Sequence, residues 1–262
     1  MAIHKMHSDS GMNAIRAVTR QAIFGRSEEV VHLRKRCAAR QSFLLHGPAG
    51  VGKTLLLLLI AAESSEVLYS PQNPTPQVLY RNLSASLLAA GHQVFTQACP
   101  NGSPSLQAKT AVSIKGLVRD ALRNSRYLVI VDHLMRPSRS VAACLRELML
   151  SCLVPVIAVS RSAHMEDAGF VLPLFPDRAE RFALRNFDPE AARLFAAGCA
   201  EAEGLSAENL PQFLDKVVDF SDGNPGAILQ MIHMATNPKY CHEDQIKVTP
   251  LYIDYKLATV SS

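Results

Sequence analysis

The chain has 262 residues and a formal net charge of +4, with 48% hydrophobic and 19% charged residues. These values fit a soluble globular protein with a sizeable core, large enough for one α/β domain and a small second one. The mildly basic charge permits nucleic acid as a partner but does not argue for it. The longest apolar run, Leu55 to Ala62, is far too short to span a bilayer, so no membrane partner is expected.

The cysteines and the N-terminal residues indicate the cellular compartment in which the protein is expected. Six cysteines stand at positions 37, 99, 144, 152, 199 and 241. None forms a C-x-x-C pair, so the sequence predicts neither a zinc site nor a disulfide framework. The N-terminus lacks the apolar segment of a secretory signal. We therefore expect a cytoplasmic protein with reduced, mostly buried cysteines.

The first part of the chain predicts an arm followed by alternating helices and strands. Residues 1–22 are the arm. Ser27 is a suitable N-cap for a helix to about Ala39, since two acidic residues follow it in the first turn. Residues 42–45 form a short apolar strand, residues 54–62 an apolar helix, and residues 66–70 a second strand that ends in a proline-rich turn.

The alternation continues to about residue 184. The expected segments are a helix at 77–90, a loop rich in Gly, Pro, Asn and Ser at 97–107, a helix at about 109–124, a strand at 127–131, a helix at 140–150 and a strand at 155–159. Alternating helices and continuously apolar strands predict an α/β fold, with a parallel sheet covered on both faces.

After about residue 184 only helices are expected. Asp188 and Pro189 begin a helix that runs to about residue 203, and Ser206 caps another that ends near residue 220. A Gly-Asn-Pro-Gly turn at 223–226 leads into a third helix, to residue 235. The tail holds one possible strand, at 245–248. The predicted parts are thus an arm (1–22), a core (23–186), a helical subdomain (187–238) and a tail (239–262).

The most specific motif is G-x-x-x-x-G-K-T, from Gly47 to Thr54. It lies between a predicted strand and a predicted helix, which is the context that a phosphate-binding loop (P-loop) requires. Its glycines let backbone N–H groups point at phosphate oxygens, and the helix N-terminus adds its positive dipole end. Lys53 can reach the β- and γ-phosphates, and the Thr54 hydroxyl can bind Mg²⁺. The expected nucleotide-binding residues are Pro48, Ala49, Gly50, Val51, Gly52, Lys53 and Thr54.

An acidic residue after another predicted strand completes the pattern that the P-loop begins. Asp132 follows four apolar residues of a predicted strand, where an acid can hold Mg²⁺ directly or through water. The alternative is an acid that caps a helix or lies in a solvated turn. The next residue, His133, stands where many ATPases carry an acid that orients the attacking water. Histidine is a poorer base there, or it is simply an exposed turn residue.

The fourth predicted strand ends at Ser160 and Arg161. If this strand lies between the P-loop strand and the Asp132 strand, both residues face the γ-phosphate. Arg161 would then sense that phosphate through charge-assisted hydrogen bonds. The alternative is a pair of surface residues at a strand end.

Together these parts resemble the AAA+ and STAND groups of P-loop ATPases. The resemblance is carried by Phe24-Gly25-Arg26, Gly47 to Thr54, Val129 to His133, Val159-Ser160-Arg161 and Gly223-Asn224-Pro225. It implies a five-stranded parallel sheet of the ASCE type with a helical lid, and ATP and Mg²⁺ as cofactors. It also implies that Asp132 is the Walker B acid and that Phe24, Gly25, Arg26 and Pro225 contribute to nucleotide binding, with Phe24 and Pro225 against adenine.

Three features depart from the family pattern. His133 replaces the usual second acid, no arginine stands beside Pro225, and no winged-helix module or receptor repeats follow the lid within the 262 residues. With Lys53, Asp132, His133 and Arg161 as the expected catalytic residues, we expect Mg²⁺-dependent ATP hydrolysis that is slow.

Three functions remain open at this point. The first is an ATP-dependent switch or assembly factor that binds a protein partner or itself. The second is an oligomeric AAA+ ATPase that regulates nucleic acid, with Arg178 or Arg181 reaching a neighbouring subunit's phosphate and the basic run at 34–36 touching a backbone. For both features the alternative of solvated basic residues on the surface is favoured. The third is a nucleotide-bound scaffold without hydrolysis, which His133 favours.

Overall fold

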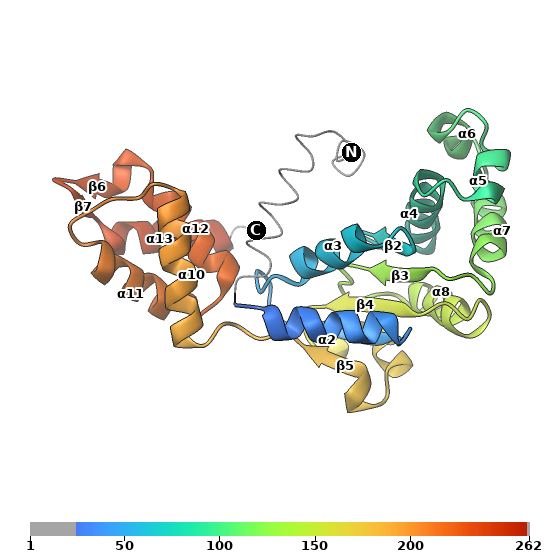
Figure 1. Cartoon of the computed structure of the whole chain (residues 1–262), viewed down its shortest axis with the longest axis horizontal. Coiled ribbons are helices and arrows are strands. Elements are labelled where there is room, and N and C mark those ends of the chain that lie inside the picture. Colours follow the sequence, from blue (N-terminus) through green and yellow to red (C-terminus); the bar gives the residue numbers. More distant parts are fainter. Residues whose placement is uncertain (1–24, 261–262) are drawn as a thin grey trace. The chain divides into compact units, whose positions relative to one another are not determined.

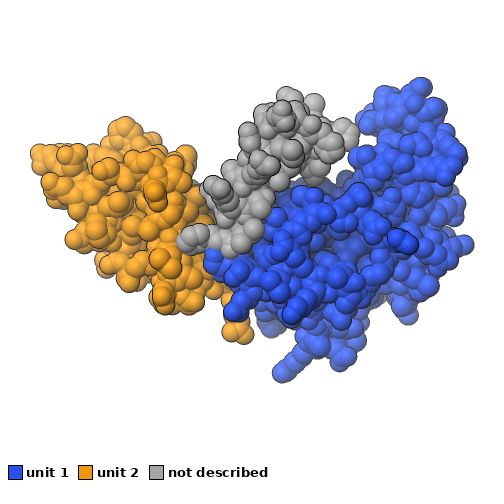
Figure 2. Space-filling view, in the orientation of Figure 1, with its two compact units in different colours: residues 1–47, 53–184 blue, residues 48–52, 185–262 orange. Residues whose placement is uncertain are grey.

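The computed structural model describes residues 25–260, so the predicted arm and Phe24 lie outside the described residues. The chain forms two compact units (Figures 1 and 2). The first contains residues up to 47 together with 53–184, and the second contains 48–52 together with the residues from 185 onward.

A five-stranded parallel sheet is the centre of the first unit. Its strands are β1 (Phe43–His46), β2 (Val67–Ser70), β3 (Leu128–Val131), β4 (Val156–Ser160) and β5 (Arg181–Ala183), in the order β2-β3-β4-β1-β5. The predicted α/β class and parallel sheet are confirmed. Strand β4 lies between β1 and β3, which is the condition on which the expectation for Arg161 rested.

Helices cover both faces of this sheet (Figure 1). They are α2 (Ser27–Ala38), α3 (Lys53–Glu63), α4 (Pro76–Ala89), α7 (Ala111–Leu122) and α8 (Arg139–Leu150). One face packs against α4, α7 and α8 through Leu44, Leu68, Val129, Val131, Val156 and Ala158. Because side chains alternate along a strand, the intervening residues face the other way. There Arg36 of α2 lies over the ring of Phe43, and α2 contacts α3.

The expected loop at 97–107 is partly helical, so that prediction was wrong. Helix α5 (Gln93–Ala98) ends inside this range, and α6 (Ser103–Gln107) occupies most of the rest. Pro104 stands in the first turn of α6, where its missing N–H costs nothing. Phe95 and Leu106 are buried in the core of the first unit, and this burial stabilises helices too short to form alone. The unit is completed by α9 (Met165–Ala168), η2 (Gly169–Leu174) and η3 (Arg178–Glu180).

The second unit is built mainly of helices, as predicted. Its elements are α10 (Pro189–Ala202), α11 (Leu210–Ser221), α12 (Pro225–Ala235), η4 (Pro238–Tyr240), β6 (Cys241–His242), β7 (Gln245–Ile246) and α13 (Val248–Val260). Phe213, Ile228 and Met231 are fully buried in its core. The core also includes Tyr240 and Leu251, so the residues expected as a tail pack here. Residues 252–255 of the tail, for which the sequence predicted no clear form, lie in α13. No helix of the described residues is both long and apolar enough to cross a membrane.

Asn209 explains why α11 begins later than expected. Ser206 was predicted to cap this helix, but the helix begins at Leu210. The Asn209 side chain makes two hydrogen bonds with the backbone of Ile246 in β7. Its Nδ2 donates to the carbonyl of Ile246 at 2.9 Å, and its Oδ1 accepts from the N–H of Ile246 at 2.8 Å. Because Ile246 is buried, this clamp satisfies two backbone groups that water does not reach.

Asn209→Ala should therefore lower the free energy of unfolding by about 1–3 kcal/mol, since both buried backbone groups of Ile246 lose their partner. Asn209→Asp keeps the acceptor but places a carboxylate oxygen against the carbonyl of Ile246, so we expect a loss at least as large. Urea unfolding measures both values. Asn101→Ala is the control, because the Asn101 side chain is exposed and far from this clamp in the chain. Equal stability of Asn209→Ala and Asn101→Ala would show that the clamp contributes nothing.

Candidate functional site

The strand–loop–helix context of the P-loop is confirmed. Strand β1 ends at His46 and helix α3 begins at Lys53. Between them, Gly50 and Gly52 have φ angles of +77° and +99°. These angles lie in the left-handed region, which glycine adopts without the steric cost that a Cβ brings. The local fold of residues 47–53 therefore depends on glycine at both positions.

Lys53 begins α3 and turns back toward the loop. Its Nζ donates to the carbonyl of Gly47 at 2.5 Å. Burial lowers the pKa of Lys53 to about 8, with the positive charge of Arg161 acting in the same direction and the carboxylate of Asp132 acting against it. The ammonium group thus lies in a partly buried place, where desolvation outweighs the attraction of the carboxylates of Asp132 and Asp167. A phosphate would supply further negative charge.

Thr54 and Asp132 form the central contact of the site. The Thr54 Oγ1 donates to Oδ2 of Asp132 at 2.8 Å. Asp132 follows the last residue of β3 and its side chain is only 1% exposed. The hydroxyl and the carboxylate, 78 residues apart in the chain, thus meet at the carboxyl ends of the strands. They offer the hard oxygen ligands that Mg²⁺ prefers, so these residues fit the predicted metal role.

Two residues that support Asp132 were missed in the sequence. The Tyr69 hydroxyl donates to Oδ2 of Asp132 at 2.7 Å. Burial and the Asp132 charge raise the pKa of Tyr69, so its hydroxyl remains a donor. The buried Asn73 side chain donates to the carbonyls of Ser70 and Asp132 at 3.1 and 3.3 Å. Tyr69 lies in a predicted strand, but only the pairing of β2 with β3 shows that it neighbours Asp132.

His133 does not point away as an isolated turn residue. Its φ angle is +52°, which is uncommon for any residue except glycine. Its backbone N–H donates to Oδ1 of Asp132 at 2.7 Å. The half-exposed ring turns back so that Nε2 lies 3.4 Å from Thr54 Oγ1 and 3.7 Å from Asp132 Oδ2. The imidazole therefore lies beside the two residues expected to hold the metal.

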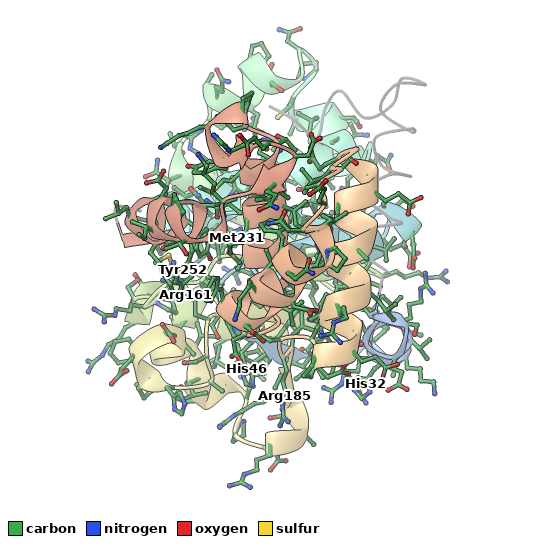
Figure 3. All side chains as sticks on the ribbon, turned by 90° about the vertical axis from the view of Figure 1, so that its left-hand side faces the viewer. His32, His46, Arg161, Arg185, Met231 and Tyr252 are labelled. Carbon is green, nitrogen blue, oxygen red and sulfur yellow. The ribbon has the colours of Figure 1, made fainter. Side chains whose placement is uncertain are left out.

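The register of β4 with β1 determines the positions of Ser160 and Arg161. Ser160 pairs with His46, so Arg161, labelled with His46 in Figure 3, comes directly after that pair. Arg161 is exposed, and its charge helps to lower the pKa of Lys53. Ser160 is buried, and its hydroxyl donates to the carbonyl of Ser162 at 2.6 Å. Arg161 is therefore placed near Lys53, whereas the Ser160 hydroxyl already has a partner.

His46 is a further titratable group at this end of the sheet. Burial is the main reason that the pKa of His46 is lowered, and the nearby charges of Arg181, His164 and Lys53 add to the effect. A lowered pKa keeps the imidazole neutral at pH 7. This end of the first unit therefore gathers cationic groups around the start of the P-loop, as an anion site requires.

The remaining residues expected to bind nucleotide belong to different units. Gly25 has a φ angle of +66°, and Arg26 is buried with its Nη1 2.7 Å from Oε1 of Glu29. Pro225 is the first residue of α12 in the second unit. Their contribution to nucleotide binding stays a prediction.

Within the second unit, the P-loop residues 48–52 contact the turn that precedes α12. Asn224 Nδ2 donates to the carbonyl of Ala49, and the N–H of Gly226 donates to the carbonyl of Gly50, both at 2.9 Å. Asn224 Oδ1 also caps α12 by accepting from Ala227 N. The sequence identified the Gly-Asn-Pro-Gly turn, but no local signal indicated that Asn224 and Gly226 contact the loop.

The arginines considered for nucleic acid or a neighbouring subunit are mostly engaged. Arg34 forms an ion pair with Glu63 of α3. Arg36 donates to the carbonyl of Ala179 at 2.6 Å. The guanidinium of Arg181 donates to two backbone carbonyls of its own chain. These three side chains therefore have a role in holding the first unit together.

Comparison with known proteins supports the fold. No protein-family model and no curated protein matches the chain. Among solved structures, it is similar to the Walker-type ATPase PABY2304 of Pyrococcus abyssi, with a TM-score of 0.60 and 16% identity over 91% of this chain and 74% of that one. A RuvB mutant of Thermotoga maritima gives a TM-score of 0.47 and 14% identity over 93% and 69%. At this identity, the first likeness shows that the chain has the fold of a P-loop ATPase.

The contact between Gly226 and Gly50 of the P-loop leads to a prediction about Gly226. A Cβ there would lie 2.8 Å from the Cα of Gly50, which is too close for any real contact. Gly226→Ala should therefore lower the free energy of unfolding by about 1–3 kcal/mol, although alanine is the better helix former. Gly198→Ala in α10 is the matched control, because a Cβ there has no neighbour within 4 Å. It should stabilise the protein by about 0.5–1 kcal/mol. Changes of the same sign in urea unfolding would contradict the contact.

Proposed function

We propose that the protein binds ATP with Mg²⁺ at the P-loop and hydrolyses it slowly, as a nucleotide-dependent switch or assembly factor of the AAA+/STAND type. The observation that carries this proposal is the contact between Thr54 and Asp132 at 2.8 Å. It joins the two halves of a nucleotide-binding pattern that the sequence places far apart. A chance P-loop match would not require a buried acid beside its threonine.

The charges around this contact fit a triphosphate. Lys53 and Arg161 supply positive charge on the first unit, and burial lowers the pKa of Lys53 although the carboxylates of Asp132 and Asp167 act against this shift. Arg161 is exposed at the end of β4, next in the sheet to the P-loop strand. We assign Lys53 to the β- and γ-phosphates and Arg161 to the γ-phosphate. Bound Mg²⁺ would neutralise charge on these phosphates.

The resemblance to AAA+ and STAND ATPases also suggests residues that bind adenine and a way in which ATP could regulate the protein. Phe24, Gly25, Arg26 and Pro225 are the residues we assign to the adenine side. The turn that carries Pro225 also carries Asn224, which bonds to the carbonyl of Ala49 in the P-loop. A change in the P-loop on binding nucleotide would thus reach α12 directly. We infer that ATP shifts the helical unit between states and so controls assembly or a protein partner.

A nucleotide-bound scaffold without turnover is the second candidate. His133 replaces an acid, and its ring faces Thr54 and Asp132 at 3.4 and 3.7 Å. In this position it is less suited to activating a water at the γ-phosphate than a carboxylate would be. Action on nucleic acid has less support, since Arg34, Arg36 and Arg181 are engaged within the chain. A steady-state ATPase assay separates turnover from binding alone.

Lys53→Ala should weaken ATP binding, because the phosphates lose a charge-assisted contact worth about 1.5–3 kcal/mol, roughly tenfold to a hundredfold in Kd. Titration calorimetry with a non-hydrolysable ATP analogue measures the change. Lys35→Ala removes an equal charge from the exposed face of α2 and serves as the control. The same affinity in wild type and Lys53→Ala would remove the P-loop assignment.

Arg161→Ala should reduce affinity for the ATP analogue by roughly tenfold or more and leave ADP binding nearly unchanged. The reason is that only the γ-phosphate is expected to reach the end of β4. Arg146→Ala is the control, since Arg146 is an exposed arginine of α8 in the same unit. Equal losses for both nucleotides would make Arg161 a structural residue, whereas no loss for either would remove its role.

A further inference from the structure

Three electron-rich atoms converge beside the P-loop. They are Asp132 Oδ2, Thr54 Oγ1 and His133 Nε2. Thr54 Oγ1 lies 2.8 Å from Asp132 Oδ2 and 3.4 Å from His133 Nε2, and His133 Nε2 lies 3.7 Å from Asp132 Oδ2. Thr54 has one hydroxyl proton, and it is donated to Asp132. In the Nδ1–H tautomer of His133, no hydrogen therefore lies between Nε2 and either oxygen. A cation between the three atoms would satisfy all of them.

The separations suit adjacent ligands of one metal ion. In an octahedral complex with bonds of about 2.1 Å, neighbouring ligands lie about 3.0 Å apart. The shortest separation already matches, and the other two exceed this value by less than 1 Å. A small rotation of the half-exposed ring would close that difference. The buried carboxylate needs no movement, because Tyr69 and the N–H of His133 hold it in place.

The backbone of His133 adds a second, independent observation. Its φ angle of +52° lies in the left-handed region, which residues with a Cβ populate sparsely. In this conformation the residue following Asp132 turns its side chain toward Thr54. The backbone conformation thus places the imidazole beside Thr54 and Asp132.

We propose that His133 Nε2 is a direct ligand of the divalent ion that accompanies the nucleotide, and that it shifts the preference of this site from Mg²⁺ toward Mn²⁺ or Co²⁺. Mg²⁺ prefers oxygen ligands throughout, whereas first-row transition ions accept imidazole nitrogen readily. The proposal rests on the proposed nucleotide binding. No group of three or more His, Cys, Asp or Glu side chains among the described residues could hold a metal by itself. The phosphates must therefore supply further ligands.

The test uses His133→Asn. Asparagine tolerates a positive φ better than other residues and offers a short oxygen ligand in place of the imidazole. Calorimetry with a non-hydrolysable ATP analogue is carried out in EDTA, Mg²⁺, Mn²⁺ and Co²⁺. In wild type, Mn²⁺ and Co²⁺ should support tighter binding than Mg²⁺. The ratio of affinities in Mn²⁺ and Mg²⁺ should fall by on the order of tenfold in His133→Asn.

A spectroscopic measurement tests the bond itself. The electron spin echo of the Mn²⁺ complex with the ATP analogue should show coupling to a histidine nitrogen, which changes on ¹⁵N-histidine labelling. The coupling should be absent in His133→Asn and present in His242→Asn, since His242 lies in β6 of the second unit.

The outcomes separate this proposal from the proposed function. Failure of wild type to bind the analogue under any condition would remove both. Nucleotide binding with the same Mn²⁺ to Mg²⁺ ratio in wild type and His133→Asn, or without nitrogen coupling, would overturn the histidine ligand and leave the nucleotide site intact. A lower ratio together with loss of the coupling supports the proposal. Thermal unfolding of His133→Asn checks that the variant folds.

Discussion

The hydrogen bond from Thr54 to Asp132 is the contact on which the organisation of the site depends. It can form because β4 separates β1 from β3 while all three strands run parallel. Their carboxyl ends then lie at one edge of the sheet, and α3 begins there. If further strands stood between β1 and β3, the P-loop and the acid would be at the same distance along the chain but farther apart in space.

Burying Asp132 has a cost that the surroundings offset. A carboxylate that is 1% exposed is strongly destabilising unless its oxygens accept hydrogen bonds. Thr54 and Tyr69 donate to Oδ2, and the N–H of His133 donates to Oδ1. Asn73 fixes the backbone carbonyl of the same residue. The acid is thus oriented before any ligand arrives, which reduces the ordering cost of binding a cation.

The sequence predicted the parts whose signals are local. Strands β1 to β4 appear within about a residue of their expected bounds, because each is a short apolar run bounded by polar or turn residues. Strands β5 and β6 were not predicted, and the strand expected at 245–248 is limited to Gln245–Ile246. The cap of α10 was also found, since Asp188 accepts from Ala191 N as its position suggested. The P-loop and the acid after an apolar strand are also local patterns, and on them the sequence selected Lys53, Thr54 and Asp132 as candidate site residues.

The parts that escaped prediction depend on contacts between distant residues. Helix α6 forms because Leu106 is buried against the core, and α11 begins late because Asn209 bonds to Ile246 instead of capping at Ser206. Tyr69 supports Asp132 only through the pairing of β2 with β3. The left-handed conformation of His133 likewise has no signal in the residue type, since histidine seldom adopts it.

The backbone carbonyls of residues 47–50 in the P-loop all accept hydrogen bonds from within the protein. Gly47 O accepts from Lys53 Nζ, Pro48 O from Val51 N, Ala49 O from Asn224 Nδ2, and Gly50 O from Gly226 N. Four successive carbonyls are therefore satisfied by the protein. In a trans peptide the N–H points opposite to the C=O, so fixing the carbonyls of Pro48 and Ala49 also fixes the directions of the N–H groups of Ala49 and Gly50. Pro48 has no N–H, and the N–H of Val51 donates to Pro48 O. Oriented N–H groups at the start of a helix form a positive concavity, which is what an anionic phosphate requires.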